Sequence, residues 1–175
     1  FRQPLHRIAK KEYGMFMEKL KTIPEARAQI RGGSKYPGIK GKVEFYEAFG
    51  GTVVMAEISG LTPRNTGQGL GFYGFHIHEG SACTGTASDE FADTDGHYQT
   101  RGKMHPEHEG DLPPLLSDKG TAWMMVYTTR FFPEEVVGKT VVIHDMPDDF
   151  RTQPSGNSGE KIACGQIVAE DPDIR

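Results

Sequence analysis

The sequence predicts an all-β fold, an antiparallel β barrel or sandwich with one long irregular loop and a short helical N-terminal extension. Three observations lead to this prediction. The 175 residues amount to about one domain, and 22 glycines with 11 prolines suit a turn-rich β protein better than a helical bundle. Short runs of alternating apolar and polar residues recur between the glycines. Residues 79–120 show almost no periodicity, and a loop of that length is usually functional.

The N-terminal segment, residues 4–21, carries apolar residues at roughly helical spacing, and Pro24 closes it. Gly14 weakens this predicted helix by about 1 kcal/mol relative to alanine. The helix either docks on the fold or stabilises a dimer, or its basic side binds a membrane surface or a partner. We therefore expect residues 1–25 to form an extension and residues 26–175 to form the β domain.

The predicted strands follow one another in short steps, with glycine pairs and prolines between them. Gly50-Gly51 separates two of them and indicates a hairpin. The strand after residue 71 is followed by the long loop, and the last two predicted strands come after it. The predicted strands span residues 28–31, 39–48, 52–58, 72–78, 121–128 and 139–144.

Composition excludes some functions and leaves the compartment open. Lys and Arg number 20 against 24 Asp and Glu, giving a net charge of -4, which argues against a nucleic-acid partner. No apolar run reaches the length of a membrane-spanning helix. No signal-peptide segment is visible, so cytoplasmic and exported-after-processing locations both stay open. Two cysteines allow one disulfide or two buried free thiols.

Six of the seven histidines lie between positions 76 and 144. His76 and His78 are two apart in a predicted strand, so both side chains point to one face and form half of a metal site, while Ile77 points into the core. As single residues, the two histidines are also consistent with a structural or incidental role. His144 ends an apolar strand and, taken alone, fits a buried core residue as well as a ligand.

The long loop adds His97, His105, His108 and Asp111. Three neutral imidazoles and one carboxylate make a tetrahedral set suited to Zn²⁺. Each residue alone would fit a solvated surface loop. Four potential ligands within fifteen residues favour a metal site.

Several ordered motifs resemble the copper/zinc superoxide dismutase family from about residue 26 to 169. They are GFHIHE at 74–79, HEGDLP at 108–113, VVIHD at 141–145 and GNSGEKIACGQI at 156–167. The resemblance implies a Greek-key β barrel with one copper and one zinc ion per chain. It implies copper ligands His76, His78, His97 and His144, and zinc ligands His97, His105, His108 and Asp111, with His97 serving both metals.

The resemblance also implies roles for residues around the metals. Asp148 matches the aspartate that links a zinc histidine to a copper histidine, and Cys83 and Cys164 match the family's disulfide. Lys161 stands where the family has an arginine that attracts the anionic substrate, so it keeps the charge but loses the planar fork. Ser155 replaces a channel threonine. Only two residues separate His105 from His108, fewer than in the family, which makes His105 the ligand most in need of a structural test.

The implied function is an enzyme, a superoxide dismutase that converts two superoxide anions to dioxygen and hydrogen peroxide. Copper would be reduced and reoxidised in turn, His97 would carry a proton, and Lys161 would draw in the substrate. The alternatives are a non-catalytic metal-binding or copper-delivery relative and a zinc-only structural protein. The first is disfavoured by the complete copper ligand set and the absence of further cysteines. The oligomeric state is left open, with a homodimer among the options.

Overall fold

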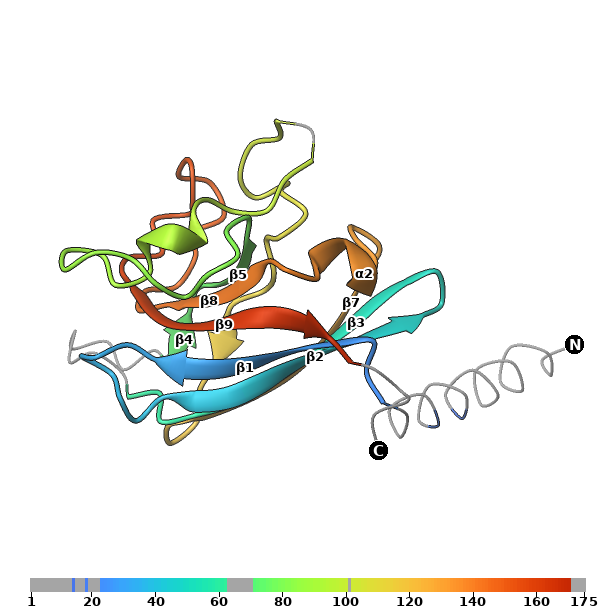
Figure 1. Ribbon diagram of the computed structural model, residues 1–175, viewed down its shortest axis with the longest axis horizontal. Coiled ribbons are helices and arrows are strands. Elements are labelled where there is room, and N and C mark those ends of the chain that lie inside the picture. The colour runs from blue at the N-terminus through green and yellow to red at the C-terminus, as the bar shows by residue number, and fades with distance from the viewer. Residues whose placement is uncertain (1–13, 15–17, 19–22, 63–70, 101, 171–175) are drawn as a thin grey trace, which may run out of the picture.

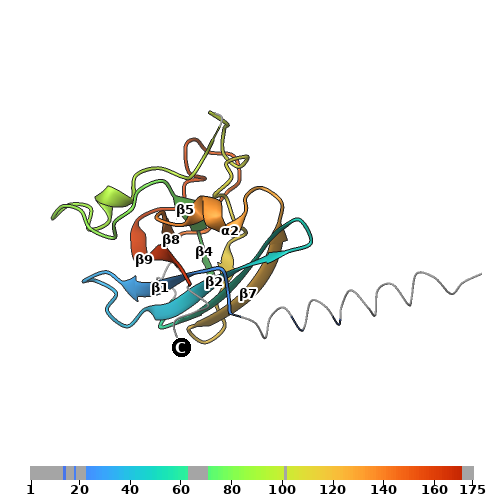
Figure 2. The same ribbon diagram turned by 45° about the vertical axis from the view of Figure 1, so that its right-hand side comes forward.

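Seven antiparallel strands form one curled sheet in the spatial order β5-β8-β9-β1-β2-β3-β7 (Figures 1 and 2). The structure is a computed structural model that describes residues 14, 18, 23–62, 71–100 and 102–170. The strands are β1 (Ala26–Gly32), β2 (Lys40–Ala48), β3 (Gly51–Ser59), β5 (Phe75–His78), β7 (Thr121–Thr128), β8 (Thr140–His144) and β9 (Lys161–Ala169). A second sheet pairs β4 (Phe72–Tyr73) with β6 (Leu115–Leu116). The short helices are η1 (Ala92–Thr94) and α2 (Pro133–Val136).

The connections confirm the all-β antiparallel prediction. Strands β1, β2 and β3 follow one another as hairpins, β9 returns to pair with β1, and β7 adds to the far side of β3. In the part of the chain that the structure describes, the edge strands β5 and β7 do not pair with each other. The sheet is therefore curled as in a barrel but open on one side.

Alternating residues of the strands fill the inside of the curl with one apolar core. Phe45 from β2 meets Phe131, which follows β7, edge to face with 6.4 Å between ring centroids. Such pairing of buried rings stabilises a core beyond their area alone. Other fully buried members include Ile30, Val43, Val54, Ile58, Ile77, Ile143 and Ile167.

Two local predictions need correction. The single strand expected over 72–78 breaks at Gly74, whose N–H donates to the Met146 carbonyl beyond the end of β8 and whose carbonyl accepts from His144 N–H. A Cβ on Gly74 would lie 2.8 Å from Ser158 Cβ, so only glycine fits this close approach. The hairpin turn consists of Phe49 and Gly50, with φ of 55° and 74°, and Gly51 already belongs to β3.

The predicted N-terminal helix lies outside the described residues except for Gly14 and Glu18, so this helix and the division at residue 25 stay predictions. Strand β9 was not predicted as a strand, although its sequence supplied a family motif. Among the described residues, none of the helices has the length and apolar character needed to cross a membrane.

Candidate metal centre

The outer face of β5, β8 and β9 carries the centre of the site. His76 pairs with Val142 and His78 with Thr140, so both histidines share one face with Val142 and His144. Ile77 and Ile143 point to the opposite face, into the core. The strand spacing therefore explains why His76 and His78 converge on one place, as the sequence predicted.

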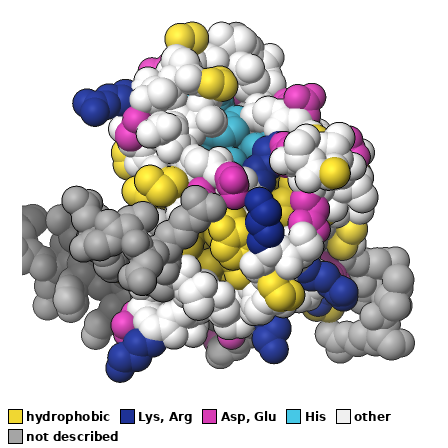
Figure 3. Space-filling view, turned by 90° about the vertical axis from the view of Figure 1, so that its left-hand side faces the viewer, with side chains coloured by type: hydrophobic (Ala, Val, Ile, Leu, Met, Phe, Trp, Pro, Cys, Tyr) yellow, Lys and Arg dark blue, Asp and Glu magenta, His cyan; other side chains and the backbone are white. Residues whose placement is uncertain are grey.

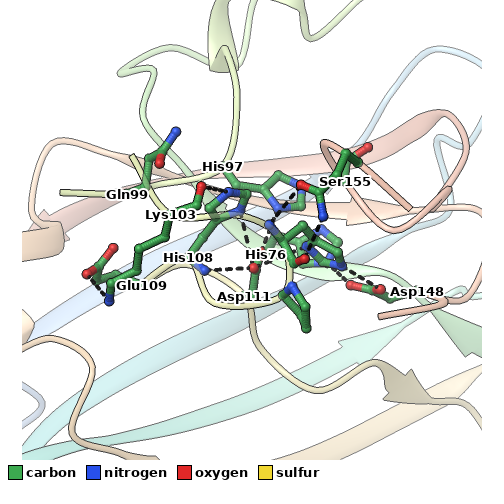
Figure 4. Close-up of polar contacts among 12 residues, drawn as sticks. His76, His97, Gln99, Lys103, His108, Glu109, Asp111, Asp148 and Ser155 are labelled. Atoms are coloured by element: carbon green, nitrogen blue, oxygen red, sulfur yellow. Dashed lines mark hydrogen bonds and ion pairs between the residues drawn. The ribbon is translucent and has the colours of Figure 1, made fainter. Parts of the chain in front are cut away.

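The long loop brings the other ligands to the same face. His97 forms an isolated β-bridge with His78, and Asp111 forms one with His76. These backbone contacts lay the loop along β5, so residues far apart in the sequence meet. Figure 4 shows His76, His97, His108 and Asp111 gathered around one region, with Asp148 on one side of it.

Two groups of four potential ligands result, and they share His97. One consists of His76, His78, His97 and His144, and the other of His97, His105, His108 and Asp111. Within each group the ligand atoms all lie within 4.8 Å of one another. Both groups match the predicted copper and zinc sets, and His105 takes its predicted place.

In most of the ligand histidines, one ring nitrogen forms a hydrogen bond to the protein, and the other is the atom that can bind an ion. His78 Nδ1 donates to the Asp95 carbonyl at 2.7 Å, and His108 Nε2 donates to that of Lys103 at 3.1 Å. His144 Nδ1 lies 3.4 Å from the Gly159 carbonyl, a weaker contact. Hydrogen bonds of this kind fix the tautomer and aim the remaining nitrogen at the ion.

Asp148 joins the two groups from outside. Its Oδ2 lies 2.8 Å from His76 Nε2, and its Oδ1 lies 2.9 Å from His105 Nε2. The carboxylate is almost fully buried between the two rings. One side chain therefore orients a ligand of each site, which is the placement that the sequence led us to expect.

Burial sets the protonation of the ligands. Desolvation holds the pKa values of His76 and His78 well below the usual range, and it lowers the pKa of His144 to about 4. For Asp111, burial alone would raise the pKa, but the hydrogen bond and charge of His97 and the nearby His105 lower it. At neutral pH, His76, His78 and His144 are therefore neutral imidazoles and Asp111 is an ionised carboxylate, which are the forms that bind metal.

A disulfide between Cys83 and Cys164 ties the start of the loop to β9, with 5.7 Å between the Cα atoms. This pairing confirms the prediction and removes the alternative of two free thiols. Cys164 packs with Phe91 and Val142 in a small apolar cluster beside the histidines. The disulfide therefore anchors the segment of loop that faces the site.

A cavity of about 500 Å³ leads from the solvent to His78, His97 and His144. Figure 3 shows histidine side chains at the bottom of this hollow, with charged side chains beside it. Lys161 lines the cavity, and its Nζ donates to the Phe91 carbonyl at 3.1 Å and contacts Asp89 Oδ2 at 3.3 Å. Ser155 also lines it.

Three residues around the site were not predicted from the sequence. Asp89 forms an ion pair with Lys161, Arg130 binds loop carbonyls beside the zinc ligands, and Gln153 binds the backbone N–H and carbonyl of His105. Each contact joins residues at least 19 positions apart in the chain. No local pattern signals such a contact, because it depends on how the loops pack.

Comparison with known proteins gives a consistent result. Residues 39–167 match the family model described as copper/zinc superoxide dismutase. A Cu-Zn superoxide dismutase 2 of Aquifex aeolicus is 33% identical over 144 residues, which cover 73% of this chain and 78% of that protein. A protein of the same name from Brassica juncea is 34% identical over 148 residues, covering 74% and 90%. The solved Cu/Zn superoxide dismutase from Brucella abortus has a TM-score of 0.68 at 27% identity, covering 83% of this chain and all of that one.

Proposed function

The chain belongs to the copper/zinc superoxide dismutase family, and we propose that it converts two superoxide anions into dioxygen and hydrogen peroxide. The observation that carries this proposal is the pair of four-ligand groups that share His97. A zinc-only structural protein would need only the second group. The complete first group, at the bottom of a solvent-accessible cavity, supports a redox enzyme.

The residues fit the two metals. His76 Nδ1 and His97 Nε2 are buried, and neither has a hydrogen-bond partner among the described residues. His105 Nδ1 and His108 Nδ1 lie 3.1 and 3.2 Å from Asp111 Oδ2, so both converge on the carboxylate of their group. A buried polar atom without a partner costs about 1–3 kcal/mol, which a bound cation would remove. Four imidazoles suit copper, and three imidazoles with one carboxylate suit zinc. When bound, copper supplies a one-electron redox couple and zinc a fixed positive charge.

His97 is the residue that we assign to proton transfer. Its Nδ1 lies 2.6 Å from Asp111 Oδ1, on the zinc side, and its Nε2 is buried without a hydrogen-bond partner among the described residues. The ring is held from one side only, so Nε2 is the atom at which a proton can be taken up and passed to the peroxide product. Asp111 would keep the ring in place during that transfer.

Lys161 is the residue that we assign to substrate attraction. Its ammonium group lines the cavity that reaches His97 and His144, and the Phe91 carbonyl holds it there. An ammonium group attracts superoxide as a point charge, without the bidentate geometry of arginine. Ser155, with its hydroxyl on the same cavity, would help to shape the channel for a small anion.

The rest of the cavity does not favour an anion. Its lining contains two lysines and four acidic residues, which are Lys35, Lys161, Asp89, Glu90, Asp95 and Glu160. The whole chain also has a net charge of -4. Attraction must therefore come from the local field of Lys161 and the bound metals, and it should weaken as salt screens that field.

The decisive experiment is reconstitution of the metal-free chain with copper and zinc. We expect one ion of each per chain and rapid dismutation of superoxide in a stopped-flow assay. Removal of copper alone should abolish the activity while zinc stays bound. Tight binding of both metals without activity would contradict the proposal and indicate a non-catalytic metal-binding relative.

A homodimer stays a proposal. Trp123 and Tyr127 are exposed on β7, an edge strand of the large sheet, and such residues support association. Sedimentation equilibrium of the metal-loaded chain would measure the mass of the assembly, with Trp123→Ser expected to shift it toward the monomer. A monomeric mass for the wild-type chain would contradict the proposal.

A further inference from the structure

Arg130 lies just beyond the end of β7, next to the loop that carries the zinc ligands. Its Nη1 donates to three carbonyl oxygens of that loop, those of Pro106 at 3.1 Å, His108 at 3.0 Å and Asp111 at 3.1 Å. Its backbone N–H donates to Thr128 Oγ1 at 3.1 Å, which fixes the start of the side chain. One exposed side chain thus binds three peptide groups, two of which belong to metal ligands.

The loop between the zinc ligands has little regular structure of its own. Only Pro106 and Glu107 separate His105 from His108. Its internal backbone bonds include one from Glu107 N–H to the Met104 carbonyl and a longer one, 3.3 Å, from Asp111 N–H to that of His108. The carbonyls that Arg130 binds set the orientation of the peptide planes on which His108 and Asp111 are mounted.

We propose that Arg130 is a positioning residue for the zinc half of the site. It holds the loop in the conformation that binds the ion, without contacting the ion itself. By fixing the peptide planes of His108 and Asp111, Arg130 keeps their ligand atoms pointing at the same zinc position. His108 Nδ1 and Asp111 Oδ2 lie 3.2 Å apart there. This inference rests on the proposed function, since it takes these two residues as zinc ligands. It adds a residue that touches neither ion nor substrate.

The sign of the effect separates positioning from simple electrostatics. Arg130 carries a positive charge close to a cation site, and like charges repel. If charge were its only influence, its removal would strengthen zinc binding. Positioning predicts the opposite. Without Arg130 the loop must become ordered when zinc binds, and this entropic cost lowers the affinity for zinc.

The test compares Arg130→Gln and Arg130→Lys with the wild-type chain and with Arg151→Gln. Arg151 is a matched control, since it is an exposed arginine in the loop that contacts His105 through Gln153. Among the described residues, no hydrogen bond joins its guanidinium to the zinc loop. Zinc affinity of the full-length, metal-free, disulfide-intact chain is measured by competition with a chelator, and Co²⁺ in the zinc site reports ligand geometry through its visible absorption bands.

We expect Arg130→Gln to weaken zinc binding about tenfold, as for other partners that orient metal ligands. Arg130→Lys should recover part of this loss, because an ammonium group can still donate to the carbonyls. The Co²⁺ bands should change in Arg130→Gln, whereas copper affinity of the four-histidine group should stay near the wild-type value. Arg151→Gln should bind zinc as tightly as the wild type or more tightly.

Three outcomes would overturn the inference. The first is an Arg130→Gln chain with wild-type zinc affinity and Co²⁺ spectrum. The second is an equal loss of copper and zinc affinity in that variant, which would indicate general destabilisation. If Arg130→Gln does not fold, the third is an Arg130→Lys chain with unchanged zinc affinity and spectrum. A wild-type chain that binds no zinc would instead overturn the proposed function.

Discussion

At the scale of single residues, the ring nitrogen that does not face the ion orients each ligand histidine through its hydrogen bond. His76 and His105 both rely on Asp148, and His78 relies on a backbone carbonyl. These partners select the tautomer, so the nitrogen that faces the ion carries a lone pair. Asp148 matters most, because it orients one ligand in each group.

Asp148→Asn tests this role. An amide can accept from only one of the two rings, so we expect affinity for copper and zinc to fall by about 10- to 100-fold. Asp149→Asn is the matched control, because the side chain of Asp149 accepts hydrogen bonds from Thr152 and from the backbone of Arg151 and not from a ligand. Metal content after dialysis against a chelator is the measurement. Equal metal loss in both variants would contradict the linking role of Asp148.

Lys161 gives a second prediction at this scale. Lys161→Ala should lower kcat/KM about tenfold at low ionic strength, and the difference should shrink as salt is added. Lys161→Arg should raise kcat/KM, because a guanidinium can bind the Phe91 carbonyl and still present donors to the anion. The control is Lys40→Ala, which removes the same charge from an exposed site on β2. If Lys161→Ala and Lys40→Ala give the same rate, Lys161 does not guide the substrate.

At the scale of elements, the loop between Cys83 and His97 connects the disulfide to the cavity. Phe91 packs against Cys164, while its carbonyl holds Lys161. Glu90, which directly precedes Phe91, accepts hydrogen bonds from the backbone N–H and the hydroxyl of Ser34. These bonds tie the loop to the β1–β2 hairpin. The disulfide, the loop and the hairpin therefore form one wall of the cavity.

Replacing both cysteines by alanine should destabilise the chain and disturb this wall. The disulfide closes a separation of 81 residues, for which the chain-entropy model gives about 4–5 kcal/mol as an upper value. We expect a fall of that order in the unfolding free energy of the metal-free protein, measured with urea. We also expect a lower kcat/KM for the metal-loaded form under conditions where it stays folded. An unchanged urea midpoint would contradict the stabilising role.

At the scale of the whole molecule, ionised Glu109 should stabilise the fold at neutral pH, and this stabilisation should be lost as the pH becomes acid. Burial alone would raise the pKa of Glu109, but hydrogen bonds from Lys103 and Thr100 lower it to about 2. A carboxyl whose pKa is depressed by folding stabilises the native state above its unfolded pKa, about 4.5. This contribution disappears as the pH falls toward 2.

Glu109→Gln should therefore cost about 2–3 kcal/mol of unfolding free energy at neutral pH. The difference from the wild type should narrow between about pH 4.5 and 2, where the wild-type carboxyl becomes protonated. Urea unfolding of the metal-free proteins at several pH values measures this difference and avoids protonation of metal-bound ligands. A gap that stays constant across this range would show that ionisation of Glu109 does not contribute.

Much of the fold follows from local patterns. Alternation and turn residues correctly located β2, β3 and β7, and the spacing of His76 and His78 correctly put both on one face. The break at Gly74 escaped prediction because the apolar pattern runs through it. At the break, Gly74 bonds to Met146 and lies close to Ser158, two residues far along the chain.

Residue type and strand spacing are enough to predict the donor types of the metal centre and the shared face of His76 and His78. The division of the ligands into a copper set and a zinc set followed from the family resemblance of the motifs. Only the tertiary structure decided how that centre is held and reached. Three contacts join segments that are distant in the chain. They are the ion pair of Lys161 with Asp89, the hydrogen bond of Gln153 to the His105 carbonyl and the hydrogen bond of Arg130 to the His108 carbonyl. Such contacts depend on how irregular loops pack against the sheet, which no periodicity encodes.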